Sequence, residues 1–190
     1  DKNAAKNPND TRLKDFMEQE NLNVKLTAVC DVFDVRAELA LNSFNTDSNS
    51  IKRYRTHQEL IDSGEVDAVV IATPDHWHAP ISIYALNAGV HVYVEKPMTH
   101  NIKETYDLRE AARNSSAVFA VGHQHRQTQS FLTAQSAVKE HVLGHVSLVQ
   151  ANTNRNDDNG AWQYDIHQLA SPKTIDWQQF LGNAPDEPFN

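Results

Sequence analysis

The stretch that decides the fold runs from residue 66 to residue 97, beginning VDAVVIATPDHWH and ending AGVHVYVEKP. Two short valine-rich runs, residues 68–72 and 90–94, bracket a segment whose apolar residues recur at helical spacing. Strands covered by helices on both faces give such nearly continuous apolar runs. Gly89 stands where a helix would end, since glycine tolerates positive φ. The stretch therefore predicts a strand, a right-handed helical crossover and a second, parallel strand.

Polar side chains follow the carboxyl end of each predicted strand. In open α/β sheets, ligands bind in the crevice outside these ends. We therefore expect one rim to carry an ammonium, carboxylates and imidazoles, supplied after the first strand by Thr73, Asp75, His76 and His78 and after the second by Glu95 and Lys96.

Three features of this stretch carry a resemblance to a known family. They are Thr-Pro-x-x-x-His at 73–78, a helix ending in Ala-Gly at 88–89, and Val-x-Val-Glu-Lys-Pro at 92–97. In this order they resemble the Gfo/Idh/MocA family, named after glucose-fructose oxidoreductase, inositol dehydrogenase and a rhizopine-catabolism protein. The resemblance covers residues 22–190. It implies an NAD(P)-dependent oxidoreductase that acts on the CH–OH group of a sugar or polyol by hydride transfer.

Pattern and resemblance together assign the chain to the α/β class, with a Rossmann-type doubly wound parallel sheet and the start of a second α/β domain. We expect residues 1–144 to form the NAD(P)-binding domain and residues 145–190 to begin a truncated substrate and oligomerisation domain. Alternation over residues 146–154 predicts the entry strand of that second domain. The resemblance also implies a homo-oligomer, because family members pair through the second domain.

One family feature is missing from the sequence. Members of the family carry a Gly-x-Gly-x-x-Gly turn before the first helix, but residues 1–21 contain no glycine. That turn lets the backbone approach the cofactor pyrophosphate at a helix N-terminus. We expect the first strand and its turn to lie upstream of residue 1. The alternative is that this chain has lost tight cofactor binding.

Asp31 ends an apolar run that begins at Val24 and reads as a strand. An acidic residue there accepts hydrogen bonds from the adenosine ribose and repels a 2′-phosphate, which favours NAD over NADP. The alternative interpretation is an N-cap for the helix predicted at 34–42. Arg36 is a nearby cation that keeps NADP open as the second cofactor.

The resemblance also assigns cofactor contacts to the loops after the strands. Glu95 would accept hydrogen bonds from the nicotinamide ribose, or would serve only as a structural carboxylate. For the histidines, the alternative is that each is a loop imidazole satisfied by its neighbours. The full expected cofactor set is Asp31, Thr73, Pro74, His76, Trp77, His78, Glu95, Lys96 and Gln124.

Lys96 is the candidate catalytic residue. Oxidising an alcohol requires a group that handles the hydroxyl proton and a nicotinamide that takes the hydride. An ammonium held at a strand end can hydrogen-bond the reacting oxygen and stabilise the developing alkoxide. In the family this lysine contacts the substrate. The alternative role for Lys96 is a salt bridge with Glu95 or a surface charge.

Further substrate contacts are expected from Arg126, Trp162 and Tyr164. Arg126 resembles a family loop residue near the nicotinamide and substrate, with an ordinary helix-start cation as its alternative. The loop around Trp162 and Tyr164 resembles the sugar-facing loop of some family members. The indole of Trp162 would stack on an apolar sugar face or plug the space between domains.

Composition restricts the partners of the chain. A net charge of −8 argues against nucleic acid and anionic membrane surfaces as partners. No apolar run approaches the roughly 18 residues that span a bilayer. The single cysteine excludes an internal disulfide framework. We expect a cytoplasmic protein, or a periplasmic one if a signal segment precedes residue 1.

Two histidine pairs, His76/His78 and His123/His125, raise the question of zinc. No cysteine or matched carboxylate completes a ligand set beside either pair, so no metal site is expected. Two other functional classes stay open. One is a glycosidase that keeps NAD bound and oxidises the sugar transiently, and the other is a non-catalytic nucleotide-binding or regulatory protein.

Overall fold

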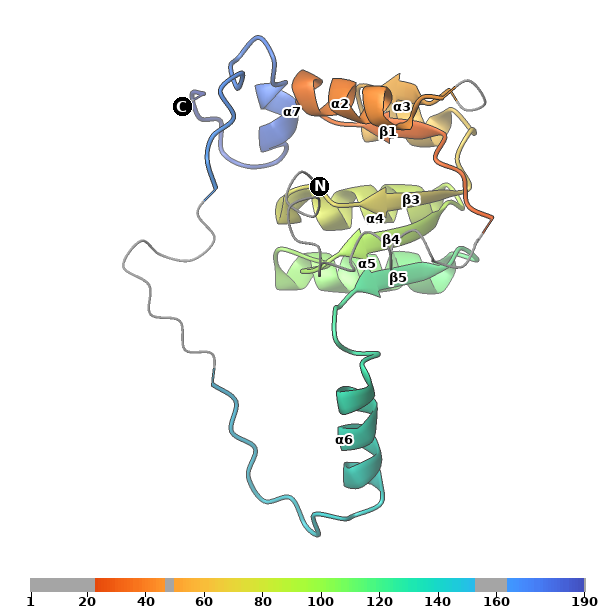
Figure 1. Ribbon diagram of the computed structural model, residues 1–190, viewed down its shortest axis with the longest axis vertical. Helices are drawn as coiled ribbons and strands as arrows, with labels where there is room; N and C mark the ends of the chain where they lie inside the picture. Colours follow the sequence, from red (N-terminus) through yellow and green to blue (C-terminus); the bar gives the residue numbers. More distant parts are fainter. Residues whose placement is uncertain (1–22, 47–49, 153–163, 190) are drawn as a thin grey trace, which may run out of the picture.

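The computed structural model describes residues 23–46, 50–152 and 164–189 (Figure 1). Strands and helices alternate along most of this length, as the βαβ pattern predicts. The strands are β1 (Ala28–Cys30), β2 (Lys52–Tyr54), β3 (Ala68–Ile71), β4 (His91–Glu95) and β5 (Phe119–Gly122). The helices are α2 (Asp34–Phe44), α3 (His57–Asp62), the 3₁₀ turn η2 (Asp75–Trp77), α4 (His78–Asn87), α5 (Ile102–Asn114), α6 (Gln129–Lys139) and α7 (Trp177–Leu181).

Pairing among the five described strands β1–β5 is parallel throughout, which confirms the predicted sheet type. β1 pairs with β2 in one sheet, and β3, β4 and β5 form a second sheet in that order. The doubly wound Rossmann sheet has six strands in the order 3-2-1-4-5-6. The five strands here correspond to its strands 2 to 6, and the position of its first strand, in the middle of the sheet, is the one left over. None of the described residues fills that position, so β1 and β3 face one another without hydrogen bonds.

The core lies on one face of the β3–β4–β5 sheet. Helices α4 and α5 cover this face, and the alternate residues Val92 and Val94 of β4 point into it and are buried. The core continues through Leu86 of α4 and Leu108 of α5, each 2% exposed.

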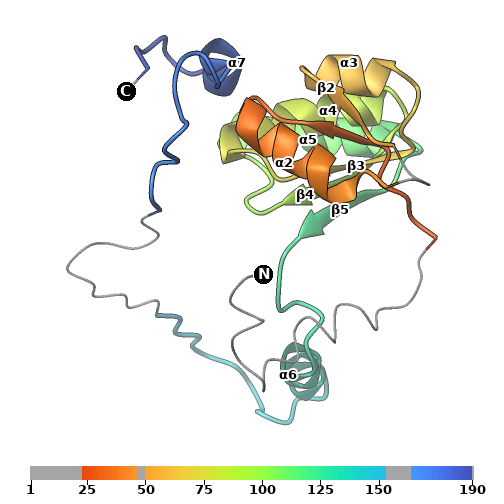
Figure 2. The ribbon, with the colours of Figure 1, turned by 45° about the horizontal axis from the view of Figure 1, so that its top comes forward.

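The opposite face of this sheet is open within the described ranges. Val70 is 75% exposed and Tyr93 is 42% exposed. The valine-rich runs predicted burial on both faces, and the structure covers only one because no described helix packs on the other. Helix α6 stands apart from the layers in both views (Figures 1 and 2), and none of its residues is buried.

Local sequence signals explain the ends of several elements. Thr56 begins α3 with a capping box, in which its side chain accepts the Glu59 N–H and the Glu59 carboxylate accepts the Thr56 N–H. Gly89 follows α4 at φ +77°, the conformation that its position predicts. The predicted helix at 34–42 is confirmed as α2.

The strand predicted over residues 146–154 is wrong for the part that the structure describes. Residues 145–152 lie in no strand and are exposed. An isolated strand has no partner for its backbone groups, and no described strand runs beside this segment. The assignment of residues 145–190 to a second domain stays a prediction.

In the described ranges, no helix is both long enough and apolar enough to cross a membrane.

Candidate functional site

Parallel pairing places the carboxyl ends of β3, β4 and β5 along one edge of the sheet. Two cavities open at this rim. The first, of about 550 Å³, lies between the ends of β1 and β3 and is lined by Asp31, Thr73 and Pro74 among others. The second, of about 410 Å³, lies at the ends of β4 and β5 and is lined by Glu95, Lys96 and Gln124 together with Tyr93, Val121, Gly122 and His123.

The carboxylate of Asp31 lines the first cavity and uses only part of its hydrogen-bonding capacity on the protein. Its Oδ1 accepts the backbone N–H of Phe33 at 2.8 Å. The N-cap of α2 is Phe33, without a side-chain bond, so the alternative role of Asp31 as a helix N-cap is wrong. A carboxylate offers about four lone-pair sites, which leaves Asp31 able to accept further donors.

Thr73 offers a hydroxyl without a partner. Its Oγ1 is buried, and no hydrogen-bond partner for it exists among the described residues. A buried polar atom without a partner carries a cost of about 1–3 kcal/mol. Thr73 lines the same cavity as Asp31. The wall of the cavity thus holds the Asp31 carboxylate and, buried behind the surface, the unpartnered Thr73 hydroxyl.

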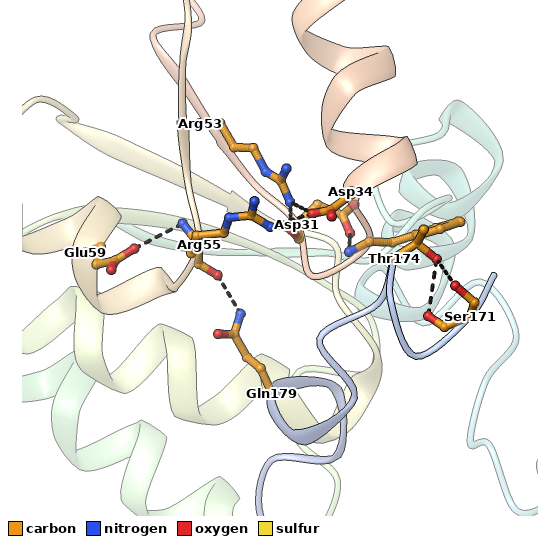
Figure 3. A network of polar contacts seen from close by, with 9 residues as sticks. Asp31, Asp34, Arg53, Arg55, Glu59, Ser171, Thr174 and Gln179 are labelled. Carbon is orange, nitrogen blue, oxygen red and sulfur yellow. Dashed lines mark hydrogen bonds and ion pairs between the residues drawn. The ribbon is translucent and has the colours of Figure 1, made fainter. Parts of the chain in front are cut away.

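Asp34 gathers two arginines beside Asp31 (Figure 3). Its Oδ1 accepts from Arg53 Nη2 and from Arg55 Nη1, each at 2.5 Å. These two guanidinium donors hold the pKa of the Asp34 carboxyl below its usual range. Arg53 also donates to the Asp31 carbonyl at 3.3 Å. Arg36 also lines the cavity; it is exposed and forms no ion pair with a described residue.

A late segment of the chain docks onto this rim, and we call residues 171–187 the strap. Ile175 forms an antiparallel bridge with Phe33. On either side of it, Asp34 N–H donates to the Thr174 carbonyl and Asp176 N–H donates to the Val32 carbonyl, both at 2.9 Å. Main-chain hydrogen bonds therefore tie the strap to the residues that directly follow Asp31.

His76 and Trp77 hold the strap from the other side of the cavity. The Nε2 atom of His76 lies 2.8 Å from the Phe180 carbonyl, and Trp77 Nε1–H donates to the Gln179 carbonyl at 2.9 Å. The indole has a single donor, so Trp77 keeps no hydrogen bond for a ligand, although its ring lines the first cavity. His76 lines neither cavity.

His78 joins the two loops of the site from behind. It is 2% exposed, with Nδ1 at 2.6 Å from the Pro97 carbonyl and Nε2 at 2.8 Å from the Thr73 carbonyl. Both ring nitrogens therefore face protein carbonyls. The structure favours the alternative of a satisfied loop imidazole for His78, which positions the loops after β3 and β4 without facing either cavity.

Lys96 in the second cavity is exposed and free of salt bridges. No carboxylate among the described residues lies within 4 Å of its ammonium, so the alternative salt bridge with Glu95 is wrong. Glu95 instead accepts the Lys96 backbone N–H at 3.3 Å. At Gly122 an added Cβ would lie 2.6 Å from the Tyr93 hydroxyl and 3.0 Å from Glu95 Oε1. Only glycine leaves room there for these two side chains.

Most residues of these two cavities lie in a part of the chain that matches a known protein family. Residues 7–123 match the model described as the oxidoreductase family with an NAD-binding Rossmann fold. The chain belongs to the Gfo/Idh/MocA family. The matched range contains both strand-end loops of the site and ends at His123, which lines the second cavity.

Relatives of the chain carry two kinds of name. It is 39% identical over 93 residues to glycosyl hydrolase family 109 protein 2 of Shewanella sp., covering 46% of this chain and 20% of that protein. It is 26% identical over 127 residues to inositol 2-dehydrogenase of Salmonella typhimurium, covering 66% of this chain and 37% of that protein. The chain thus spans well under half of these Gfo/Idh/MocA relatives.

A solved structure supports the fold assignment. The myo-inositol 2-dehydrogenase of Lactobacillus plantarum superimposes with a TM-score of 0.56 at 27% identity, over 65% of this chain and 35% of that one. This agreement and the family model confirm the predicted Rossmann-type α/β class.

The expected substrate residues are not brought together. Arg126 lies in the turn before α6 and Tyr164 is 81% exposed, and neither lines a cavity. Trp162 lies outside the described residues. Across the described ranges, no group of three or more His, Cys, Asp or Glu side chains is arranged to hold a metal ion.

Sequence reasoning missed the contribution of the strap to the first cavity. Ile175, Gln179 and Phe180 line it beside Asp31, almost 150 residues later in the chain. The apolar spacing of residues 175–182 predicts a short helix with its apolar side buried; α7 (Trp177–Leu181) confirms the helix, but none of its residues is buried. The pattern does not say which surface the helix packs against.

Gly182 tests the docking of the strap. It adopts φ +59°, and an added Cβ would lie 2.6 Å from Trp77 Cζ2. We expect Gly182→Ala to cost about 1–3 kcal/mol, through strain and overpacking, and to increase amide hydrogen exchange at Thr174–Gln179. The matched control is Gly64→Ala, because Gly64 also has positive φ but has nothing within 4 Å of its added Cβ. Equal exchange of the strap in both variants would contradict the docking.

Cys30 tests the interior of the first cavity. Burial, followed by the nearby charges of Asp31 and Glu59, raises the pKa of its thiol to about 11. At pH 8 only about one molecule in a thousand then carries the reactive thiolate. We expect iodoacetamide to alkylate the folded chain roughly a hundredfold more slowly than the chain in urea, measured by mass spectrometry. Comparable rates in the two states would show that Cys30 is neither buried nor shifted.

Proposed function

We propose that this chain is part of an NAD-dependent oxidoreductase that transfers a hydride between the cofactor and a CH–OH group of a polyol or sugar. One observation carries the proposal. The Asp31 carboxylate lines a cavity on the same rim as the Lys96 ammonium, which has no ion-pair partner among the described residues. The family of the chain, an oxidoreductase family with an NAD-binding fold, supports this choice.

The residues of the first cavity suit the adenosine half of the cofactor. Asp31 would accept the ribose hydroxyls and repel a 2′-phosphate, because like charges at short range cost energy. Asp34 already engages both Arg53 and Arg55 in ion pairs, so neither guanidinium is free for that phosphate, and Arg36 is the cation of this cavity that would favour NADP. NAD is therefore proposed over NADP.

The residues of the second cavity suit the reacting end. Glu95 would accept hydrogen bonds from the nicotinamide ribose, and Gln124 offers an amide beside it. When bound, the nicotinamide supplies the hydride acceptor or donor. His78 holds the loops of both cavities in register through the Thr73 and Pro97 carbonyls.

Lys96 would act on the substrate oxygen. Its ammonium has three donors and no salt-bridge partner among the described carboxylates, so it is available to a hydroxyl. A positive charge at that oxygen stabilises the negative charge that develops as the proton leaves. The same charge would polarise a carbonyl in the reverse direction.

A polyol is the proposed substrate class. The second cavity is lined by polar groups from Glu95, Lys96, His123 and Gln124, which can exchange hydrogen bonds with several hydroxyls. The relatives named inositol 2-dehydrogenase support this class. Which polyol or sugar is bound is left to a substrate panel.

Glycoside hydrolysis with transient sugar oxidation is the second candidate. The 39% identical relative named as a family 109 glycosyl hydrolase favours it. The two candidates differ in the cofactor balance. Net hydrolysis of a glycoside without net change in the redox state of the bound nicotinamide would select the hydrolase, and stoichiometric NADH formation would select the dehydrogenase.

Lys96→Ala tests the catalytic assignment in the native protein. We expect turnover on a panel of inositols and sugars to fall about 10²–10³-fold, because one stabilising charge at the reacting oxygen is lost. NAD affinity, measured by calorimetry, should stay within about twofold. The matched control is Lys103→Ala, since Lys103 pairs with Asp107 on the surface of α5. Full turnover in Lys96→Ala would remove the residue from the mechanism.

Asp31→Asn tests the cofactor assignment. Removing the carboxylate removes both a strong acceptor and the repulsion of a 2′-phosphate, so the ratio of NAD to NADP affinity should fall by at least about tenfold. Asp75→Asn is the control, because Asp75 is exposed at the same rim but lines neither cavity. An unchanged ratio in Asp31→Asn would place the ribose elsewhere, and absence of binding of either nucleotide to the wild type would end the dehydrogenase proposal.

A further inference from the structure

We propose that the strap completes the base-binding end of the nucleotide site, with Gln179 hydrogen-bonding the edge of the adenine and Phe180 and Ile175 forming part of its wall. This inference rests on the proposed function, since it assumes that the first cavity takes the adenosine half of NAD. It assigns a specificity role to a segment that lies outside the residues matched by the family model.

The strap is anchored where the base of a bound nucleotide would lie. A purine is joined directly to its ribose, so it must sit within a few ångströms of the ribose position at Asp31. The strap binds the main chain at Val32, Phe33 and Asp34, the next three residues. Its side chains therefore enter the cavity on the side that a base would occupy.

The wall of this cavity suits a flat heteroaromatic ring. Most of the side chains around it are apolar or aromatic, while few polar groups converge on it, which is typical of sites for such rings. An aromatic side chain such as Phe180 adds a face or edge for stacking. The apolar and aromatic members include Val32, Phe33, Pro74, Trp77, Ile81 and Phe180.

Gln179 is held so that its amide has one orientation. Its Nε2–H donates to the Arg55 carbonyl at 2.7 Å (Figure 3), and an acceptor at that point fixes the nitrogen on that side of the amide. Its backbone is held as well, by the Asp176 carboxylate at its N–H and by Trp77 at its carbonyl. Such a preorganised amide can discriminate between bases because it cannot flip.

The free atom of this amide defines the base that it recognises. The Gln179 Oε1 has no hydrogen-bond partner among the described residues, so it can accept a hydrogen from a ligand. Adenine carries a donor at its exocyclic N6, whereas hypoxanthine carries an acceptor oxygen there. An anchored Gln179 would thus favour adenine, and it could not adapt to hypoxanthine by rotation.

The experiment compares two nucleotides that differ at this edge of the base, where hypoxanthine has an acceptor oxygen in place of the N6 donor and a hydrogen on N1. Calorimetry on the native protein would measure the affinities of NAD and of nicotinamide hypoxanthine dinucleotide, with AMP and NMN as half-cofactors. One neutral hydrogen bond contributes about 0.5–1.5 kcal/mol, so the wild type should prefer NAD by about two- to tenfold. Gln179→Leu should abolish this preference and weaken AMP by a similar factor, while NMN affinity stays unchanged.

The matched control is Gln178→Leu. Gln178 is the adjacent residue of α7 and bonds Asp186 without lining the cavity, so its variant should keep the wild-type preference. Hydrogen exchange of the strap in each variant checks that α7 stays docked.

The outcomes separate the inference from the proposed function. Wild-type protein that binds neither NAD nor AMP overturns both. Wild-type protein that binds NAD while Gln179→Leu keeps its preference for adenine overturns the inference alone. Equal weakening of both dinucleotides in Gln179→Leu also overturns it, because a strap that only supports the fold would not distinguish between bases.

Discussion

Parallel pairing of β3, β4 and β5 beneath α4 and α5 is the constraint on which the rest of this structure depends. Parallel strands end at the same edge, so the loops after Ile71, Glu95 and Gly122 are forced to lie side by side. Burial of Val92 and Val94 under the helices fixes the register. A shift of one residue would turn these valines to solvent and would move Glu95 to the other face of the sheet.

The polar groups of the rim divide into those that face a cavity and those that support it. Asp31 and Lys96 keep atoms free for a ligand. Both ring nitrogens of His78 lie against backbone carbonyls of the loops after β3 and β4. His76 Nε2 and Trp77 Nε1 lie against backbone carbonyls of the strap. Residues that resemble a binding motif can therefore serve it by positioning other residues, as groups around a site often do.

The strap links the two ends of the described chain in one network. Asp34 is bonded by Arg53 and Arg55 through its carboxylate and by Thr174 through its N–H. Gln179 then returns to the Arg55 carbonyl. The end of β1, the end of β2 and the strap are thus linked by hydrogen bonds and ion pairs around the first cavity.

The sequence by itself determined the type and order of the elements, because apolar periodicity and turn residues act locally. It also determined that Thr73, Glu95 and Lys96 share a rim, since parallel strands align their ends. Only the tertiary structure decided which of these groups are free, what His76, Trp77 and His78 bind, and where α7 packs. Those outcomes depend on partners such as Phe180, which lies 104 residues from His76. Local patterns carry no information about contacts across such a separation, and the strand expected at 146–154 failed for the same reason, because pairing requires a neighbour.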